Sequence, residues 1–445
     1  MAERTTRSSV HLDVEPGARQ TAAEVEPDTP FQILVVGDFS GRANRGVPAF
    51  SGRRRPRQVD ADNLDQAIEE MEVSLDLPQM TLRFRSLDDF HPDRIYQNVD
   101  VFRKLAETRE RPAAAAATAP EKKSHQELGR SVLESMLSQE EPEVEDAYDL
   151  PAFIERVTAG ETVAKEDPRK KQWTASVDAT SAKVMRAILH HPQFQALEAA
   201  WRAVWLLIQR LEPDSELKIF LFDATLDELT ANPSWLEAHL AHPREPWAVI
   251  VGNYSFGQTP DDVSRLHALG RFAVDVGAPL LAEAQPPSDE HSGPHWRQLR
   301  RSPEAAWIGL VVPRFLLRLP YGKTTSAIET FAFEEMPESV HAAYLWGNPA
   351  FAAACLLGEA FREDGWRLRP GQRSQIDGLP LHMYDEDGEA QNKPCAEVLL
   401  TETDAEFLLE QGLMPLASLK NQDAALLVRF QSIADPLASL AGRWR

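Results

Sequence analysis

Cysteine is nearly absent from this sequence. Its 445 residues include two cysteines, Cys355 and Cys395. They stand at no spacing typical of a metal or redox centre, which excludes a disulfide framework and a CxxC motif. This pattern fits a protein of a reducing compartment, and we expect a cytoplasmic location.

Long hydrophobic runs are also missing. No uninterrupted apolar stretch approaches the roughly 20 residues that a membrane-spanning helix needs. Residues 1–30 are polar and lack the apolar core of a signal peptide. We therefore expect no direct membrane insertion.

Basic residues are outnumbered. Lys and Arg total 47 against 69 Asp and Glu, a formal net charge of -22. Such a field repels phosphate backbones and anionic membranes, which argues against nucleic-acid binding. Two readings of the acidity remain open: solubility alone, or a specific basic partner such as an oppositely charged neighbouring subunit.

What is present is an ordinary globular composition, with 43% hydrophobic and 26% charged residues. The length predicts about two to four folding units. Strand-like and helical patterns alternate along the chain, which predicts a mixed α/β fold. The predicted organisation is a flexible arm, a small α/β domain, a linker with a weakly helical acidic segment, and a larger α/β domain, over residues 1–29, 30–106, 107–179 and 180–445.

In the small domain, the β-branched run from Phe31 to Val36 predicts a buried strand. Apolar spacing over residues 63–75 predicts a helix, alternation at Leu82 and Phe84 a strand, and residues 99–105 a further helix. Alanine, proline and charge dominate residues 107–126, which predicts a linker.

In the large domain, Pro192 should interrupt or restart a long helix. The residues Phe194, Leu197, Trp201, Trp205 and Ile208 recur at three- and four-residue steps and should be core. Strands are expected at 217–222, 247–251 and 279–284, with helices at 234–239 and 261–276.

Two motifs suggest a phosphate or dinucleotide site. PYGKTT, Pro320–Thr325, ends like a P-loop, but the position five residues before Gly322 is Leu317, where that motif needs glycine. GDFSGR, Gly37–Arg42, follows a strand but lacks the three-glycine spacing of a dinucleotide fingerprint. A structural turn is the preferred reading of both.

Two histidine-containing strings suggest a metal site or acid–base catalysis. SLDDFHPD carries Asp88, Asp89, His91 and Asp93, but Asp89 or Asp93 serves more simply as a helix cap. His190 and its neighbour His191 would point about 100° apart on a helix and could not share a metal. No GxSxG elbow occurs. We expect no catalytic residue, cofactor or metal, with a nucleotide-binding enzyme or hydrolase as the remote alternative.

Several of these strings together resemble a known family. FQILVVGDFSGR, VDADNLDQAIEEM and LRFRSLDDFHPDRIYQNVDVFRKL, within residues 30–108, are similar to the N-terminal domain of the small sheath subunit of type VI secretion systems (VipA/TssB type). PWAVIVGNYSFG, WIGLVVPRFLLRLPYGKTT, YLWGNPAFAAACLL and DGLPLHMY, within residues 180–435, resemble the large subunit (VipB/TssC type).

The resemblance implies a structural, non-enzymatic subunit of a contractile sheath. It also implies other sheath subunits, an inner tube protein, a baseplate and an AAA+ disaggregase as partners. The small-subunit resemblance ends near Leu105, and the large subunit's C-terminal extension is not recognisable after Trp444 and Arg445. These departures raise the expectation of weak polymerisation, or of a cap or baseplate anchor.

An adaptor that binds effectors or the disaggregase without joining a sheath is the second hypothesis, motivated by the arm and linker as tethers. An interaction surface is expected among basic residues near strand ends, because partners of an acidic protein need complementary patches. The candidates are Arg53, Arg54, Arg55, Arg57, Arg297, Arg300 and Arg301. The alternative for these residues is a solvated loop.

Overall fold

The computed structural model describes residues 25–47, 55–78, 80–110, 168–231, 240, 245–287, 293–386 and 388–444. We call residues 25–110 the N-terminal segment and residues 168–444 the C-terminal segment. Most of the predicted arm and linker, and the helix expected at 234–239, lie outside the described residues.

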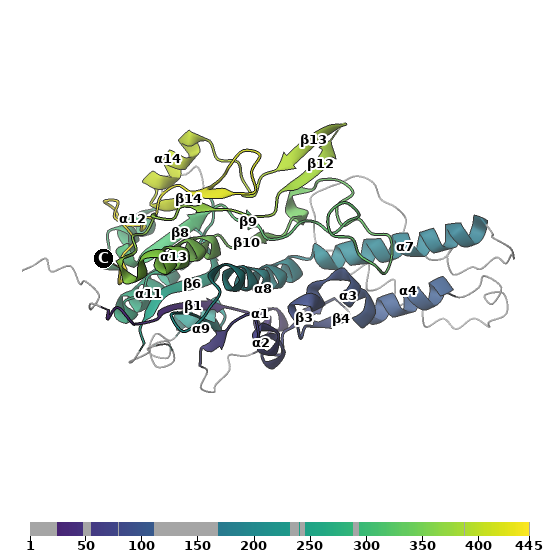
Figure 1. Ribbon diagram of the computed structural model, residues 1–445, viewed down its shortest axis with the longest axis horizontal. Coiled ribbons are helices and arrows are strands. Elements are labelled where there is room, and N and C mark those ends of the chain that lie inside the picture. Colours follow the sequence, from purple (N-terminus) through teal and green to yellow (C-terminus); the bar gives the residue numbers. More distant parts are fainter. Residues whose placement is uncertain are drawn as a thin grey trace, which may run out of the picture.

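A large mixed sheet runs through the molecule (Figure 1). Its strands, in spatial order, are β11 (Gln375–Ile376), β15 (Ala425–Leu427), β14 (Leu413–Ser418), β8 (Ile308–Val312), β7 (Leu280–Ala284), β6 (Trp247–Phe256), β1 (Phe31–Gly37), β5 (Leu217–Asp223) and β2 (Arg57–Val59). The strands from β14 to β5 are parallel, whereas β2, β15 and β11 are added antiparallel. The predicted mixed α/β fold is confirmed.

Strand β1 lies inside this sheet, between two strands of the C-terminal segment. It pairs in parallel with β5, Ile33 opposite Ile219, and with β6, Ile33 opposite Val249. All seven of its residues are buried, as the apolar run predicted. The sequence-based boundaries of the two domains stay predictions, but the two segments share one sheet.

Each face of the sheet is covered by an apolar layer. Successive side chains of β1 point alternately into one layer and then the other. Ile33 and Val35 join the cluster that contains α8 (Pro192–Leu211) and α13 (Ala350–Asp364). Leu34 and Val36 join the cluster that contains α11 (Pro260–Val276) and α12 (Pro294–Arg300). A three-layer α/β/α arrangement results.

Helix α8 follows α7 (Pro168–Leu189). The helix is interrupted after Leu189 and restarts at Pro192, as predicted. Of the predicted core stripe on α8, all are buried except the partly buried Trp205. The predicted strands at 217–222, 247–251 and 279–284 and the helix at 261–276 appear as β5, β6, β7 and α11.

The remaining elements of the N-terminal segment pack on one another, with η1 in contact with α8 and α4 in contact with α7. They are α1 (Arg42–Arg45), α2 (Leu64–Glu70), β3 (Ser74–Leu77), β4 (Met80–Arg83), η1 (Leu87–Phe90), α3 (Pro92–Asn98) and α4 (Asp100–Glu110). The predicted helix over 63–75 was too long, because α2 ends at Glu70, Glu72 adopts a positive φ of 52°, and Leu75 pairs with Leu82 in a hairpin. Apolar spacing alone did not distinguish this short hairpin from a continuing helix.

The C-terminal segment adds smaller elements around the sheet. These are α9 (Leu226–Ala231), η3 (Pro303–Trp307), β9 (Phe315–Leu316), η4 (His341–Ala343), β10 (Trp346–Gly347), η5 (Gly365–Arg367), β12 (His382–Glu386), β13 (Glu389–Lys393) and α14 (Glu402–Glu410). The β12–β13 hairpin projects from the body, and α4 and α7 extend together at one end (Figure 1). Within the described ranges, none of the helices combines the length and apolar character needed to cross a bilayer.

Candidate functional site

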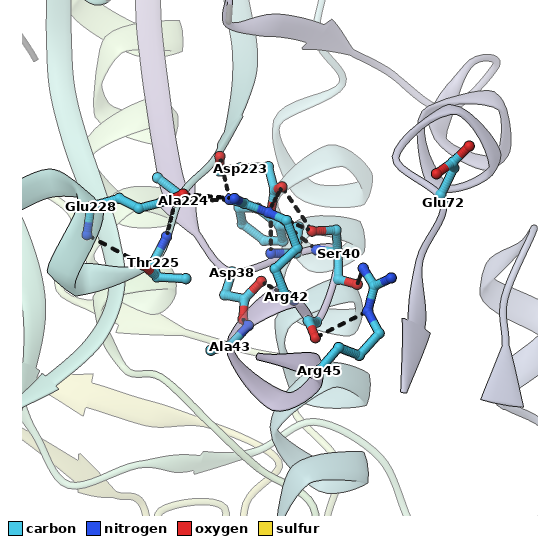
Figure 2. Close-up of polar contacts among 12 residues, drawn as sticks. Asp38, Ser40, Arg42, Ala43, Arg45, Glu72, Asp223, Ala224, Thr225 and Glu228 are labelled. Atoms are coloured by element: carbon cyan, nitrogen blue, oxygen red, sulfur yellow. Dashed lines mark hydrogen bonds and ion pairs between the residues drawn. The ribbon is translucent and has the colours of Figure 1, made fainter. Parts of the chain in front are cut away.

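The strand order changes direction at β1, since the chain runs from β1 to β5 on one side and then to β6 on the other. In open α/β sheets, the carboxyl ends of the strands at such a point commonly bind ligands. Here the turn after β1, residues 38–41, reaches the end of β5. Side chains of both segments meet there (Figure 2).

Arg42, from the N-terminal segment, fills this position. Its Nε lies 3.0 Å from Oδ2 of Asp223, at the end of β5, and its Nη1 and Nη2 donate to the Glu228 carboxylate of α9 at 2.7 and 2.9 Å (Figure 2). The Arg42 side chain is 9% exposed. Burial opposes its charge, but the two carboxylates outweigh that effect and raise its pKa. We call Arg42, Ser40, Asp223 and Glu228 the joint.

The carboxylate of Asp223 in the joint is hydrogen-bonded to other groups of the same chain. Oδ1 of Asp223 accepts from the Phe39 and Ser40 amides at 2.8 and 3.0 Å, and Oδ2 accepts from the Ser40 hydroxyl at 2.8 Å. Trp201 of α8 donates from Nε1 to the Phe39 carbonyl at 3.0 Å. Ion pairs and hydrogen bonds at this turn therefore hold the two segments together, in addition to the strand pairing.

The GDFSGR string is a turn with its own geometric requirement. The Asp38 carboxylate accepts from the Arg42 and Ala43 amides at the start of α1. Gly41 has φ 74°, and a Cβ there would lie 2.4 Å from the Ser74 carbonyl oxygen, so glycine is needed. The amides of this turn bind the chain's own carboxylates, which supports the structural reading over a dinucleotide site.

A second charged cluster is buried in the C-terminal segment. Arg318, 10% exposed, donates to the Glu198 carboxylate at 2.8 and 3.1 Å and to the Glu335 carboxylate at 2.8 and 3.1 Å. Glu198 and Glu335 are 0% and 1% exposed. Arg202 also binds Glu198 at 2.7 Å and the Tyr321 hydroxyl at 2.9 Å. We call Arg318, Arg202, Glu198 and Glu335 the buried cluster.

The PYGKTT loop is held by Glu335 of this cluster and by the neighbouring Glu334. The Tyr321 amide donates to Glu335 at 2.7 Å, and the Lys323 amide donates to Glu334 at 3.0 Å. In a P-loop such amides would face phosphate oxygens. Here carboxylates of the same chain occupy two of them, so the turn reading is again the supported one.

Acid should weaken the buried cluster. Burial alone would raise the pKa of Glu335, but the Arg318 charge and hydrogen bonds from Arg318 and the Tyr321 amide outweigh it and lower the pKa to about 2. A depressed carboxyl pKa stabilises the fold above the unfolded-state pKa near 4.5, and this contribution fades as the pH falls towards 2.

We therefore expect Glu335 to contribute roughly 3 kcal/mol that is lost between pH 4.5 and pH 2. Urea unfolding across this range, compared with Glu335→Gln, measures the contribution. Equal pH slopes in the two proteins would contradict the expectation.

Two aspartates of the SLDDFHPD string have different roles. Asp89 completes a capping box with Ser86, as predicted. Asp93 instead reaches the C-terminal segment, where its carboxylate accepts from the Glu329 and Thr330 amides at 3.1 Å and from the Thr330 hydroxyl at 2.8 Å. The main contacts of Asp93 are therefore with the C-terminal segment, which the capping role considered for it did not anticipate. They form a second link between the two segments.

The basic residues proposed as an interaction surface lie in separate parts of the fold. Arg55 is exposed, and Arg57 on β2 pairs with Glu70, while Arg53 and Arg54 lie outside the described residues. Arg297 is exposed on α12 and Arg301 pairs with Asp435 at 3.4 Å. Arg300 is engaged internally, since it donates to the carbonyls of Ile433 and Glu410 at 2.8 and 3.0 Å.

Sequence reasoning missed the joint and the buried cluster. Arg42 and Arg318 were visible only as members of the GDFSGR and LRLPYGKTT strings. Each has a carboxylate partner more than a hundred positions away, Asp223 for Arg42 and Glu198 for Arg318. No local pattern links such residues.

The comparisons with known proteins agree with this arrangement. A family model described as "EvpB/VC_A0108, tail sheath N-terminal domain" matches residues 171–239 and 288–434. A second, described as "Type VI secretion system, VipA, VC_A0107 or Hcp2", matches residues 2–144. The second match reaches well past Leu105, so the expectation that the small-subunit resemblance ends there was wrong.

Two relatives from Pseudomonas aeruginosa carry the same assignment. The type VI secretion system sheath protein TssC1 is 32% identical over 59% of this chain and 61% of its own length. The sheath protein TssB1 is 28% identical over 24% of this chain and 65% of its own length. The chain thus spans less than two thirds of either relative.

Among solved structures, a chain of the anti-feeding prophage baseplate is similar at 14% identity over 53% of this chain and 51% of its own, with a TM-score of 0.31. A likeness this low adds nothing to the assignment. The two family models, by contrast, together match most of the chain, and it belongs to the sheath proteins of type VI secretion systems. In particular, it is a fused protein, with a small-subunit-like segment followed in one polypeptide by a large-subunit-like segment.

Proposed function

We propose that this chain is a structural subunit of a type VI contractile sheath in which one polypeptide supplies what a pair of small and large subunits supplies. The observation that supports this most directly is the position of β1, from the small-subunit-like segment, between β5 and β6 of the large-subunit-like segment. A central strand cannot leave a sheet without exposing the backbone groups of both neighbours. The two segments therefore act as one building block.

Aromatic packing supports the same proposal. Phe90 of the N-terminal segment stacks on Phe84 with ring centroids 4.0 Å apart and meets Phe194 of α8 at 5.9 Å. All three rings are buried. Apolar burial, strand pairing, the joint and Asp93 thus hold the segments together, with covalent fusion adding a high effective concentration.

The proposed setting follows from this role. The partners would be further sheath subunits, with an inner tube protein, a baseplate and an AAA+ disaggregase as the finer expectation, and the location would be the cytoplasm. No catalytic step is part of the proposal. The relatives named above are sheath proteins, which favours this role over an adaptor outside the sheath.

Microscopy of assembled protein tests the proposal. Cryo-electron microscopy would be carried out on the chain alone and then with a conventional pair of small and large sheath subunits. Regular tubes of the chain alone would establish a self-sufficient fused sheath, and decoration of tube ends would establish a cap or anchor. Absence of the chain from tubes in both preparations would overturn the proposal.

A cleavable chain tests the single building block separately. We expect a protein with a protease site introduced between Ala113 and Ala117 to remain one particle after complete cleavage, because the contacts between the segments do not depend on the connection. Size-exclusion chromatography under native conditions, with denatured samples to prove cleavage, measures this. Separation of the fragments in native buffer would contradict it.

A further inference from the structure

Helix α14 presents an unusual acidic stripe. Glu402, Glu406 and Glu410 follow one another at four-residue spacing, which places them on one face, and all three are exposed. Like charges at this spacing repel, and Glu410 also lies at the helix C-terminus, where the helix dipole disfavours an anion. Among the described residues, no ion pair involves any of the three.

An exposed aromatic side chain accompanies the stripe. Phe407, 47% exposed, follows Glu406 directly and is three residues from Glu410. Its neighbour Leu408 points into the core and is 7% exposed, which anchors the helix on the sheet. A large apolar ring beside unpaired carboxylates is typical of a contact surface, where aromatic residues carry much of the binding energy.

Helix α12 supplies the opposite charge. Arg297 and Arg301 are four residues apart, at the spacing of two neighbouring glutamates of the stripe, and both are exposed. The Arg301 side chain is 70% exposed, and its pairing with Asp435 is an exposed contact of 3.4 Å that contributes little. This basic stripe remains available to another molecule.

The two stripes belong to one surface of the molecule. Arg300 joins the C-terminal end of α12 to that of α14 through the Glu410 carbonyl and to the following loop through the Ile433 carbonyl. In Figure 1, α12 and α14 lie at the same end of the sheet. Leu437, two residues after the Arg301 partner Asp435 in that loop, is 45% exposed and adds apolar area to the surface.

We propose that this surface binds a second copy of the chain, with the acidic stripe of each copy on the basic stripe of the other. A surface that carries both signs side by side is complementary to itself across a two-fold axis. Because the whole chain carries a net charge of -22, two copies repel unless local basic residues offset that field. The arginines of α12 provide the offset, and the exposed Phe407 and Leu437 provide apolar contact.

Such a pair is closed and stops at two copies, unlike the open contacts of a helical tube. It is therefore a state of the protein additional to the proposed sheath role, and does not depend on it. Its formation should weaken as salt rises, because the stripes are exposed to solvent.

Reciprocal charge reversal tests the pair, with sedimentation velocity of the full chain over a dilution series as the readout. The wild-type chain should approach twice the monomer mass at high concentration. Both R297E/R301E and E406R/E410R should remain monomers when studied alone. An equimolar mixture of the two variants should recover the two-copy mass, because both contacts are then between opposite charges. R83E/R85E, at exposed positions at and just after the end of β4, changes the net charge as R297E/R301E does; it is the control for that variant and should pair like the wild type.

A monomeric wild-type chain at every concentration would overturn the pair, as would reversal variants that still self-associate or a mixture that does not recover. Mass that grows beyond two copies in the mixture would indicate head-to-tail contact and would also overturn it. The two proposals can fail independently, because the pair is judged by the two-copy mass and its response to charge reversal, whereas the sheath role is judged by the presence of the chain in tubes under the microscope.

Discussion

Replacing Arg318 by methionine is expected to destabilise the folded protein by about 3–5 kcal/mol, the cost of leaving buried charges without a partner. The change keeps most of the side-chain volume but removes the cation between Glu198 and Glu335, which are 0% and 1% exposed. Arg202 still reaches Glu198, so Glu335 suffers the greater loss. Urea unfolding followed by tryptophan fluorescence measures the change.

Two further variants serve as controls for this measurement. Arg103→Met removes an ion pair with Asp100 in which the two side chains are 61% and 79% exposed. It should lower the free energy of unfolding by no more than about 1 kcal/mol. Arg318→Lys retains the charge but loses the two-pronged hydrogen bonding to each carboxylate and should fall between the two. Equal losses for Arg318→Met and Arg103→Met would show that the buried cluster does not stabilise the fold.

Replacing Arg42 by methionine should destabilise the protein by about 3 kcal/mol and loosen the two segments from each other. Asp223 and Glu228, 17% and 10% exposed, would then lie near each other without the guanidinium between them. Urea unfolding of the intact chain measures the first effect. The second appears after cleavage between Ala113 and Ala117, when the variant fragments should separate at lower urea concentration than wild-type fragments.

Arg45 provides a matched control on the same short helix. It hydrogen-bonds to the Ser40 and Gly41 carbonyls and to no residue of the C-terminal segment among its described contacts. Arg45→Met should therefore cost about 1 kcal/mol and leave fragment association nearly unchanged. If both variants shift fragment separation equally, the joint does not hold the segments together.

Local patterns in the sequence predicted several elements correctly. The buried strand at Phe31–Val36, the break at Pro192 and the helix of α11 appear where expected. In each case the signal is a property of neighbouring residues, either apolar periodicity or the missing amide of proline.

The same reasoning fails where a distant partner decides the structure. Asp93 binds the amides of Glu329 and Thr330, more than 200 positions away, rather than only capping a helix. The helix predicted over 63–75 fails for a nearer reason, since Leu75 belongs to a hairpin with Leu82 that apolar spacing does not distinguish from a helix. Apolar spacing and capping patterns describe one face of one element. They do not identify what that face or side chain meets across the fold.

The family, the α/β class and the order of the two segments could be inferred from residue strings, because these features can be read along the chain. The tertiary structure alone decided that β1 lies between β5 and β6, and that Arg42 and Arg318 bind carboxylates from distant elements. The physical reason is that strand pairing and buried charge neutralisation depend on distance in space. Burial makes them strong by removing competing water, and only the folded chain brings the partners together.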